Sequence, residues 1–443
     1  MNTHSERARQ WVHVGSGAFA FLLRGLTWWE GAALAVFALA FNALVLPRVG
    51  GRRLYRPVDR ARGFPLGILL YPLAVLLLIL IFSSRLDIAA AAWGILAFGD
   101  GAATLVGQRV GGRRWPWNHD KTIGGSAAFV LCASAGGILL AWWTRPNVAP
   151  PPSFWFVLLA PIAAAFAAGA VETVPVRLDD NISVPAAAAA VLWLASLMTT
   201  DAVQGNLAAV VRAVPLALVV NAAVAWAGYR ARSVSVSGAV GGALVGVIIY
   251  AGAGVAAWAL LLLAFILASV TSRLGLTRKM LLGIAEERGG RRGAGNAFAN
   301  CGVASLAAIA YVTTPYAAAA MLALVTALTA GGSDTVASEI GKAWGRSTFL
   351  VTSMGRVKPG TPGAMSLEGT AAGVIAALTL AVISAAFGLI AANLILAVVA
   401  GATIGALVES ALGATLEEPG ILNNDMLNFI NTGVAAVVAI AIA

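Results

Sequence analysis

Acidic side chains are scarce in this chain, and several of them follow directly on apolar stretches. There are nineteen in 443 residues; Asp100 and Glu172 each stand near the end of an apolar stretch, and Asp180 follows soon after. Ionised carboxylates are costly among apolar residues and are usually kept there for function. Carboxylate oxygens also suit Mg²⁺, whose shell substrate phosphates can complete. We therefore expect Asp100, Glu172 and Asp180 to act in catalysis, with Asp100 and Asp180 as metal ligands.

Basic residues and glycines follow Asp100 within the stretch 98–126. Arg109, Arg114 and Lys121 could neutralise the oxygens of a polyphosphate. The next apolar stretch opens on Gly124, Gly125 and Ser126, where the backbone N–H groups of a helix N-terminus could bind an anion.

A second set of acidic residues repeats this order. Asp334 follows Asp100 by 234 residues, and Glu409 follows Glu172 by 237. The polar run Asn423-Asn424-Asp425 then corresponds to Asp179-Asp180-Asn181. For any single carboxylate, a solvated helix cap or an ion pair with a loop arginine is the alternative. Two ordered sets favour two metal–phosphate sites.

The composition is that of a membrane protein. Hydrophobic residues make up 60% of the chain, charged residues 11%, and the mean hydropathy is +0.86. The apolar runs are too long for barrel strands, so we predict an all-α polytopic membrane protein. About fifteen transmembrane helices are expected, roughly 12–27, 30–47, 64–82, 86–106, 122–143, 154–175, 183–199, 206–226, 235–251, 254–272, 295–312, 315–331, 364–384, 386–405 and 430–443.

The basic loops predict the orientation. With the N-terminus inside, the loops 48–62, 107–121, 273–294 and 341–358 are cytoplasmic and carry most of the Lys and Arg residues, as the positive-inside rule requires. This explains the net charge of +10 without a nucleic-acid partner. We expect an integral protein of a bacterial inner membrane, with the N-terminus and both sites cytoplasmic.

The span count is compatible with an internal duplication. Two seven-helix repeats in the same orientation need one linking helix, and the span near 206–226 supplies it. The predicted domains are residues 1–201 and 202–443. The chain contains neither a G-x-x-x-x-G-K-[ST] nor an H-E-x-x-H motif, and its two cysteines lie in or beside apolar runs. Nothing in the first residues resembles a cleavable signal peptide.

At these residues the first half resembles the phytol/dolichol kinase family of integral membrane kinases. The resemblance covers about residues 5–200 and is carried by Glu6–Arg9, His13, Gly63–Pro65, Tyr71–Leu73, Gly99–Gly107, Trp117–Ser126, Glu172 and Asp179–Asn181. It implies CTP-dependent phosphorylation of a polyprenyl alcohol, with His13 and Asn181 near the site. For His13 alone, an interfacial histidine is the alternative; for Trp115 and Trp117, interfacial aromatics or nucleobase stacking.

The second half, about residues 205–443, is similar to the family that includes phytyl-phosphate kinase. The matching residues are Thr271–Gly275, Lys279, Arg292, Asn296, Asn300, Ser333–Gly341, Lys358–Ser366, Glu409–Ser410 and Asn423–Asn424. Asn296 stands where that family has Gln. The resemblance implies conversion of a prenyl monophosphate to the diphosphate.

Together the two resemblances imply a fusion of two kinase modules that use Mg²⁺ and CTP for successive steps. The acceptors would be an isoprenoid alcohol of the phytol, geranylgeraniol or farnesol type and its monophosphate, drawn from among the membrane lipids. In the second half, the expected catalytic residues are Asp334, Glu339 and Glu409, with Asp334 and Asp425 as metal ligands. The expected phosphate-binding and neighbouring residues there are Lys279, Arg292, Lys342, Arg356, Lys358, Ser366, Asn296, Asn300 and Asn424.

Three alternatives stay open at this point. A CDP-lipid-type cytidylyltransferase also uses a membrane-embedded Mg²⁺–CTP site but releases pyrophosphate. A lipid or ion transporter can carry a duplicated fold and intramembrane carboxylates. One half could also be a catalytically inactive partner of the other.

Overall fold

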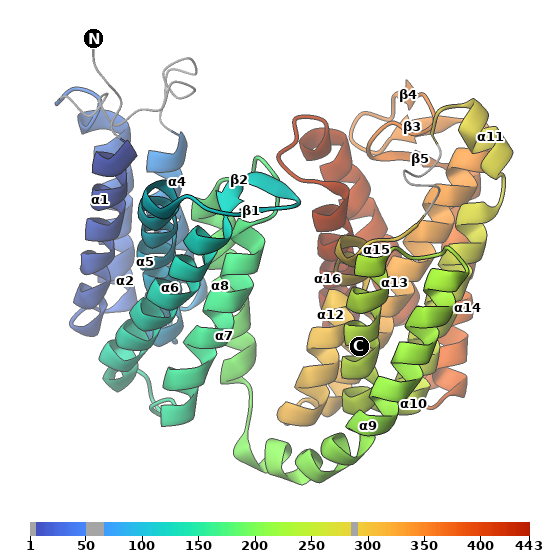
Figure 1. Ribbon diagram of the computed structural model, residues 1–443, viewed down its shortest axis with the longest axis horizontal. Coiled ribbons are helices and arrows are strands. Elements are labelled where there is room, and N and C mark those ends of the chain that lie inside the picture. The colour runs from blue at the N-terminus through green and yellow to red at the C-terminus, as the bar shows by residue number, and fades with distance from the viewer. Residues whose placement is uncertain (1–5, 50–65, 285–290) are drawn as a thin grey trace. The chain divides into compact units, whose positions relative to one another are not determined.

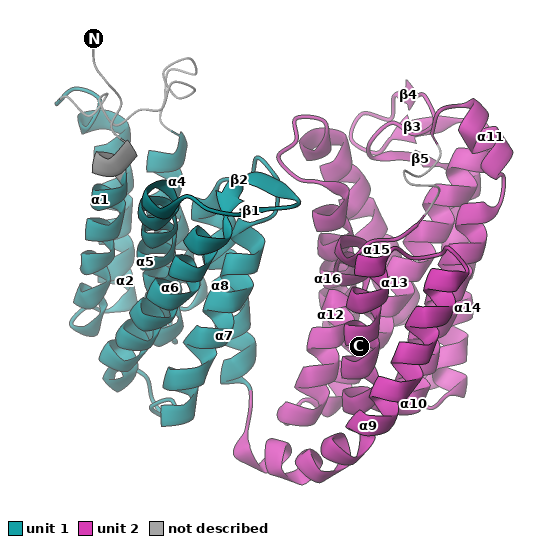
Figure 2. Cartoon of the chain, viewed as in Figure 1, with its two compact units in different colours: residues 1–197 teal, residues 198–443 magenta. Residues whose placement is uncertain are grey.

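The computed structural model describes residues 6–49, 66–284 and 291–443, with side chains from residue 10 onward. The chain forms two compact units, residues 1–197 and 198–443 (Figures 1 and 2). The predicted boundary after residue 201 lies four residues beyond this division. Most of the predicted arginine-rich loop 48–62 and the motif residues 63–65 fall outside the described residues, as do the side chains of residues 6–9.

The described chain is almost entirely helical, which confirms the predicted all-α membrane fold. The helices of the first unit are α1 (Glu6–Ser16), α2 (Trp28–Ala40), α4 (Leu66–Ile81), α5 (Leu86–Val110), α6 (Ile123–Thr144), α7 (Phe154–Glu172) and α8 (Asp180–Ser196). Those of the second unit are α9 (Thr200–Arg230), α10 (Val236–Arg273), α11 (Leu276–Leu281), α12 (Ala294–Thr313), α13 (Ala317–Trp344), α14 (Leu367–Ala386), α15 (Ile395–Leu412) and α16 (Asn424–Ile442).

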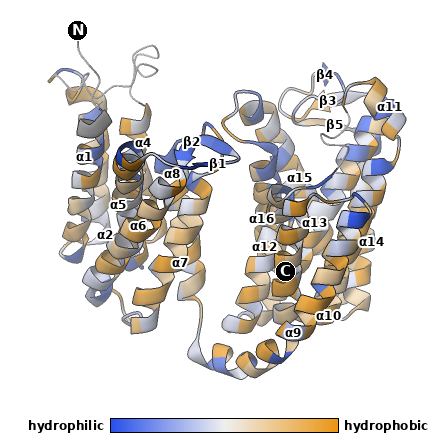
Figure 3. Cartoon of the chain, viewed as in Figure 1, coloured by the Kyte–Doolittle hydropathy of each residue, from blue (hydrophilic) through white to orange (hydrophobic). Residues whose placement is uncertain are grey.

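Eleven helical segments of the described chain are long and apolar enough to cross a membrane, against about fifteen predicted spans. Part of the difference lies in α10, where Gly254 has a φ of 86° and interrupts the helix. The predicted spans 235–251 and 254–272 are its two legs. α4 and α8 are apolar but shorter, with 16 and 17 residues. Figure 3 shows the apolar residues along the helices and the polar ones gathered in connecting segments such as β2.

One central helix in each unit carries a predicted catalytic aspartate. Of an apolar 18-residue stretch in each candidate span, 67% is buried in α5 and 78% in α13. These are the two highest values among the candidate spans. Small residues allow this close packing: a Cβ on Gly94 of α5 would lie 2.9 Å from the backbone oxygen of Gly136 on α6. In a membrane, such contacts hold helices together through van der Waals packing.

Short strands, which the sequence did not predict, follow both central helices. β1 (Arg114–Trp115) pairs with β2 (Asn118–Thr122), antiparallel, between α5 and α6. Between α13 and α14, β3 (Thr348–Leu350) lies between β4 (Arg356–Val357) and β5 (Ala364–Ser366). Both sheets lead directly into the next helix, so they fix where α6 and α14 begin.

Candidate active sites

Three carboxylates meet in the first unit. Asp100 comes from α5, Glu172 from the last residue of α7 and Asp180 from the first residue of α8. One oxygen of each lies within 4.8 Å of the others. Within the ranges that the structure describes, no other three His, Cys, Asp or Glu side chains approach one another in this way. The structure thus brings together the three residues that sequence order alone had grouped.

Lys121 of β2 joins this cluster. Its Nζ donates to Glu172 Oε1 at 2.5 Å and to Asp180 Oδ2 at 3.1 Å. Burial lowers the pKa of Lys121, but Asp180 and Glu172 raise it by more, so it lies above its ordinary value. Burial raises the pKa of the Asp180 carboxyl, against the opposing effect of Lys121. Lys121 is therefore a stable ammonium within the cluster.

The cluster has the charge and the donors for a divalent cation. Counted formally, three carboxylates against one ammonium leave an excess of two negative charges. Glu172 Oε2 is buried and has no hydrogen-bond donor among the described residues. Buried anionic oxygens are normally paired or bound to metal, and hard oxygen donors suit Mg²⁺. These three residues fit such an ion.

His13 and Asn181 lie beside the cluster and hold its members in place. His13 Nε2 is 3.6 Å from Asp100 Oδ2, and its ring meets that of Tyr71 edge-on at 4.6 Å. Asn181 Nδ2 donates to the Gly67 oxygen at 3.2 Å and to Asp179 Oδ1 at 2.7 Å. Asn181 thereby ties the start of α8 to α4.

The glycine-rich start of α6 differs from its predicted role. The Gly125 N–H donates to Thr122 Oγ1 at 3.1 Å, and Ser126 Oγ accepts from Trp115 Nε1 at 3.0 Å. A Cβ on Gly125 would lie 3.0 Å from the Ala103 oxygen. The predicted phosphate contact of the Gly125 N–H is therefore replaced by a helix cap, and this glycine is needed for packing.

The remaining first-unit residues of the prediction are on the surface of the basic loop. Arg109 is exposed in the last turn of α5, and Arg114 is exposed on β1. Gly124 lies in the first turn of α6 and is partly buried. Trp115 and Trp117 stack on each other with ring centroids 4.6 Å apart.

The second unit contains a polar cavity of about 310 Å³. Asp334 of α13, Glu409 of α15 and Glu417 line it together with Arg292 and Lys342. Glu409 Oε2 also accepts from Asn431 Nδ2 at 2.6 Å. The volume is in the ~300–1,000 Å³ range of ligand pockets. Both acidic and cationic groups thus face one space, as binding of a phosphate compound requires.

Of the other predicted second-unit residues, some line this cavity and some do not. Those that line it are Asn296, Asn300, Ser366 and Asn424. Arg356 and Lys358 are exposed on and after β4, outside the lining. Asp425 is also outside it: a Cβ on Gly295 would lie 2.2 Å from Asp425 Oδ2, so this carboxylate faces α12. Its helix register directs Asn424 and Asn428 to the cavity instead.

Glu339 and Lys279 are buried partners of each other and do not line the cavity. Each side chain is 1% exposed, and Lys279 Nζ lies 2.5 Å from Glu339 Oε2. Lys342 Nζ lies 3.0 Å from the other oxygen, Oε1. The predicted roles of Glu339 in catalysis and of Lys279 on phosphate stay predictions, and the structure shows these two side chains paired with each other. Glu339 positions Lys342, and Lys279 balances its charge.

Comparison with known proteins places the second unit in a family. The protein-family model described as "Integral membrane protein DUF92" matches residues 219–436. An uncharacterised membrane protein of Synechocystis is 41% identical over 202 residues, which are 45% of this chain and 78% of that protein. The chain belongs to the DUF92 family of integral membrane proteins.

Two further relatives of this DUF92 chain carry informative names. "Protein VTE6, chloroplastic" of Arabidopsis thaliana is 36% identical over 213 residues, 46% of this chain and 64% of that protein. "Probable phytol kinase 2, chloroplastic" of Glycine max is 33% identical over 167 residues, 37% of this chain and 54% of the relative. The chain thus spans about half the length of that phytol kinase. No solved structure matches it.

The DUF92 match contains the whole polar cavity, from Arg292 to Asn428, and begins after the three-carboxylate cluster. Among the cavity residues, Ser338, Glu417 and Asn428 were missed from sequence. A helical pattern could have found two of them: Asp334, Ser338 and Lys342 are spaced by four, as are Asn424 and Asn428. Residues at that spacing share a helix face.

Proposed function

We propose that this membrane protein is a CTP-dependent isoprenoid kinase that phosphorylates a prenyl alcohol and then the resulting monophosphate. The first step is assigned to residues 1–201 and the second to residues 202–443, as a fusion of two related kinase modules. The relatives named phytol kinase support the substrate class. The observation that carries the proposal is the meeting of Asp100, Glu172 and Asp180 beside Lys121.

In the first unit, Asp100, Glu172 and Asp180 are the residues that would hold Mg²⁺. The bound ion would supply positive charge against the phosphate oxygens. Phosphoryl transfer depends mainly on positioning and charge neutralisation. Lys121 contributes charge within the cluster, while Arg109 and Arg114 bind the nucleotide from the exposed loop.

The first transfer converts a hydroxyl into a phosphate monoester. The prenol oxygen forms a bond to the γ-phosphorus of CTP, the bond from that phosphorus to the β–γ bridging oxygen breaks, and CDP leaves. One carboxylate of the cluster accepts the hydroxyl proton. Asp100 is our choice, through the oxygen that would not bind the metal ion, because Glu172 and Asp180 are already engaged by Lys121.

The second transfer joins two anions. An oxygen of the prenyl monophosphate attacks the γ-phosphorus of a second CTP, giving the prenyl diphosphate and CDP. Like-charge repulsion must be offset, and Arg292 and Lys342 face the same cavity as Asp334 and Glu409. The last two would hold Mg²⁺, with Ser366 and Asn424 at the cavity wall.

Fusion would retain an amphiphilic intermediate on one polypeptide. Both sites are placed at the cytoplasmic face of a bacterial inner membrane, where CTP is available. The basic loops beside each site support this orientation under the positive-inside rule.

The test is product analysis. Purified full-length protein with Mg²⁺ receives phytol, geranylgeraniol or farnesol and, in parallel, each of CTP, ATP, GTP and UTP. We expect mono- and diphosphate with CTP and stoichiometric release of CDP. Release of pyrophosphate would identify a cytidylyltransferase instead, and absence of both products with every nucleotide would refute the kinase.

A further inference from the structure

A second, apolar cavity adjoins the polar cavity of the second unit. Its volume is about 130 Å³, and its walls come mainly from α9, α10, α12 and α13. Arg292, Asn296 and Asn300 line both cavities. The two spaces therefore meet at one cationic and two amide side chains.

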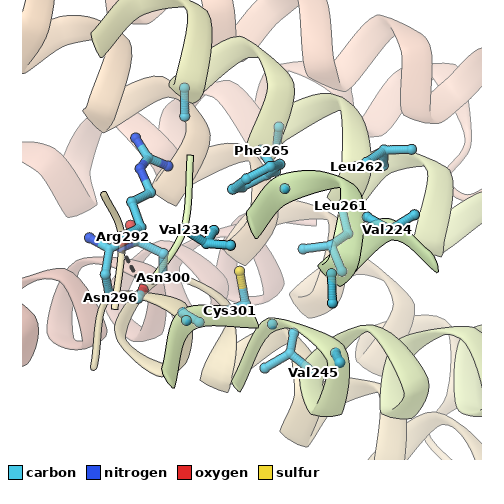
Figure 4. Close-up of a pocket in the computed structure, with 18 of the residues that line it drawn as sticks. Val224, Val234, Val245, Leu261, Leu262, Phe265, Arg292, Asn296, Asn300 and Cys301 are labelled. Carbon is cyan, nitrogen blue, oxygen red and sulfur yellow. Dashed lines mark hydrogen bonds between the residues drawn. The ribbon is translucent and has the colours of Figure 1, made fainter. Parts of the chain in front are cut away.

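Polarity changes steeply along the apolar cavity (Figure 4). Arg292, Asn296 and Asn300 lie together on one side of the view. Leu261, Leu262 and Val224 lie on the other side. A ligand that fills the space must therefore be apolar along its length and polar at one end.

The junction is suited to an anion. Arg292 supplies the positive charge there, and Lys342 lines the polar cavity beyond it. Asn296 and Asn300 add amide side chains at the place where the two cavities meet. Amide N–H groups can donate to phosphate oxygens.

We propose that the apolar cavity binds the phosphate-proximal isoprene units of a single-chain phosphate monoester, whose phosphate lies at Arg292 in the polar cavity. This inference rests on the proposed second step and identifies the part of the site that recognises the acceptor's chain. It makes the apolar cavity a determinant of specificity separate from the phosphotransfer residues.

α9 is the wall between this cavity and the lipid. Val224 and Ala225 line the cavity, whereas the side chain of Trp226 is 67% exposed. Only 11% of the apolar 18-residue stretch of α9 is buried. The cavity is smaller than the ~300–1,000 Å³ of pockets that enclose a whole ligand. The rest of a long chain continues along α9 into the membrane.

Gly242 offers a direct way to fill the cavity. It lines the apolar space, and a Cβ built on it meets no heavy atom within 4 Å. We expect Gly242→Leu to weaken binding of radiolabelled farnesyl monophosphate to the purified full chain by about tenfold or more. The measurement uses no nucleotide, and the polar cavity is unchanged.

Gly205→Leu is the matched control, because Gly205 is an exposed helical glycine with equal free space and lies outside both cavities. It should bind like the wild type. Equal binding by Gly242→Leu and wild type would overturn the inference, even if the wild type makes diphosphate. If only Gly242→Leu loses binding and the wild type forms no diphosphate, the apolar cavity is supported as a binding site and the second phosphorylation is refuted.

A second measurement needs no change in the cavity. Cys301 lines it, and the other cysteine, Cys132, can be replaced by Ser. Farnesyl monophosphate should slow modification of Cys301 by N-ethylmaleimide at least several-fold, whereas inorganic phosphate should not. Unchanged rates would refute the proposal. Equal protection by dioleoyl phosphatidic acid would assign the cavity to a two-chain membrane lipid and also overturn it.

Discussion

The two units share a packing arrangement and differ in charge. A Cβ on Gly107 of α5 would lie 3.1 Å from Oγ1 of Thr122, the residue that caps α6. A Cβ on Gly341 of α13 would lie 3.0 Å from Oγ of Ser366, the residue that caps α14. Each glycine follows the proposed catalytic aspartate of its helix, Asp100 or Asp334, by seven residues. This likeness supports the proposed duplication.

The charged groups on this common frame are placed differently. Eight residues after the aspartate, the first unit has Gln108 and the second has Lys342. Directly before the cap, the first has Lys121 and the second has Met365. Lys121 of the first unit pairs with two carboxylates of the cluster. Lys342 of the second unit pairs with Glu339, which is outside the cavity lining, and itself lines the cavity.

This difference is what two acceptors of different charge would require. A neutral alcohol needs a metal site and a base, and the first unit provides a cluster with excess negative charge. An anionic monophosphate needs cations facing it, and the second unit provides Arg292 and Lys342. In the proposed function, one packing arrangement would therefore serve both phosphorylation steps, with the lysine at a different position in each unit.

Removal of either aspartate is the strongest test of this division. Asp100→Asn should reduce phosphorylation of the alcohol about a thousandfold and spare that of added monophosphate; Asp334→Asn should do the reverse. Each step is measured separately by product analysis. Asp201→Asn, at the exposed start of α9, is the control. If one change abolishes both reactions, the units do not act separately.

The next effect concerns the buried ion pair between Lys279 and Glu339 of the second unit. Glu339→Gln leaves Lys279 buried without its counter-ion, and breaking such a pair costs about 3–5 kcal/mol. We expect a lower thermal unfolding midpoint. Five residues after Asp100 the first unit has Leu105, so the double change Lys279→Met with Glu339→Leu should recover most of the loss. No recovery would show that the pair does more than balance charge.

Exchange of the cavity lysine has a smaller effect. Lys342→Gln places in the second unit the residue type that the first unit has at the corresponding position, Gln108. Loss of a charged hydrogen bond should lower kcat/KM for the monophosphate about 10- to 100-fold, mainly through a higher KM. Alcohol phosphorylation should be unchanged. Arg346→Gln removes an exposed cation outside the cavity lining and serves as the control. Equal effects of the two substitutions would show that Lys342 contributes only to the general positive charge of the surface and does not contact the substrate.

The smallest expected effect is common to both units. Thr122→Ala and Ser366→Ala each remove an acceptor for a helix N–H, Gly125 in one case and Gly369 in the other. Each substitution should lower the free energy of unfolding by about 1 kcal/mol. The two variants should show similar decreases in the thermal unfolding midpoint. Thr122→Ser and Ser366→Thr keep the oxygen and should cost less. Very different costs would argue against a shared frame.

Much of this organisation could be predicted from the sequence because membrane burial constrains it strongly. Apolar length predicts helices, and acidic residues near their ends predict the groups that meet. Glu172 ends α7 and Asp180 begins α8, whereas Asp100 lies inside α5, ten residues before that helix ends. The order of the residues was enough for that prediction.

The charge of a residue was not enough to predict whether its side chain lines the cavity, because that depends on which group it pairs with in the fold. Glu339 and Lys279 satisfy each other, and neither faces the cavity. Asp425 and Asn424 are neighbours on one helix, and only the helix rotation decides which of them lines the space. The strands β1–β5 were missed because they are two to five residues long and depend on pairing rather than on a local pattern.

The break in α10 at Gly254 has a further consequence. Gly238 and Val245 from the leg before it line the apolar cavity, and so do Leu261 and Phe265 from the leg after it. The two walls are therefore joined covalently through Gly254, which has a φ of 86° and a ψ of 177°. This conformation is open essentially to glycine and costs other residues about 1–3 kcal/mol. The backbone angle at this glycine therefore helps to set the distance between the two walls, and with it the width of the chain that the proposed site could bind.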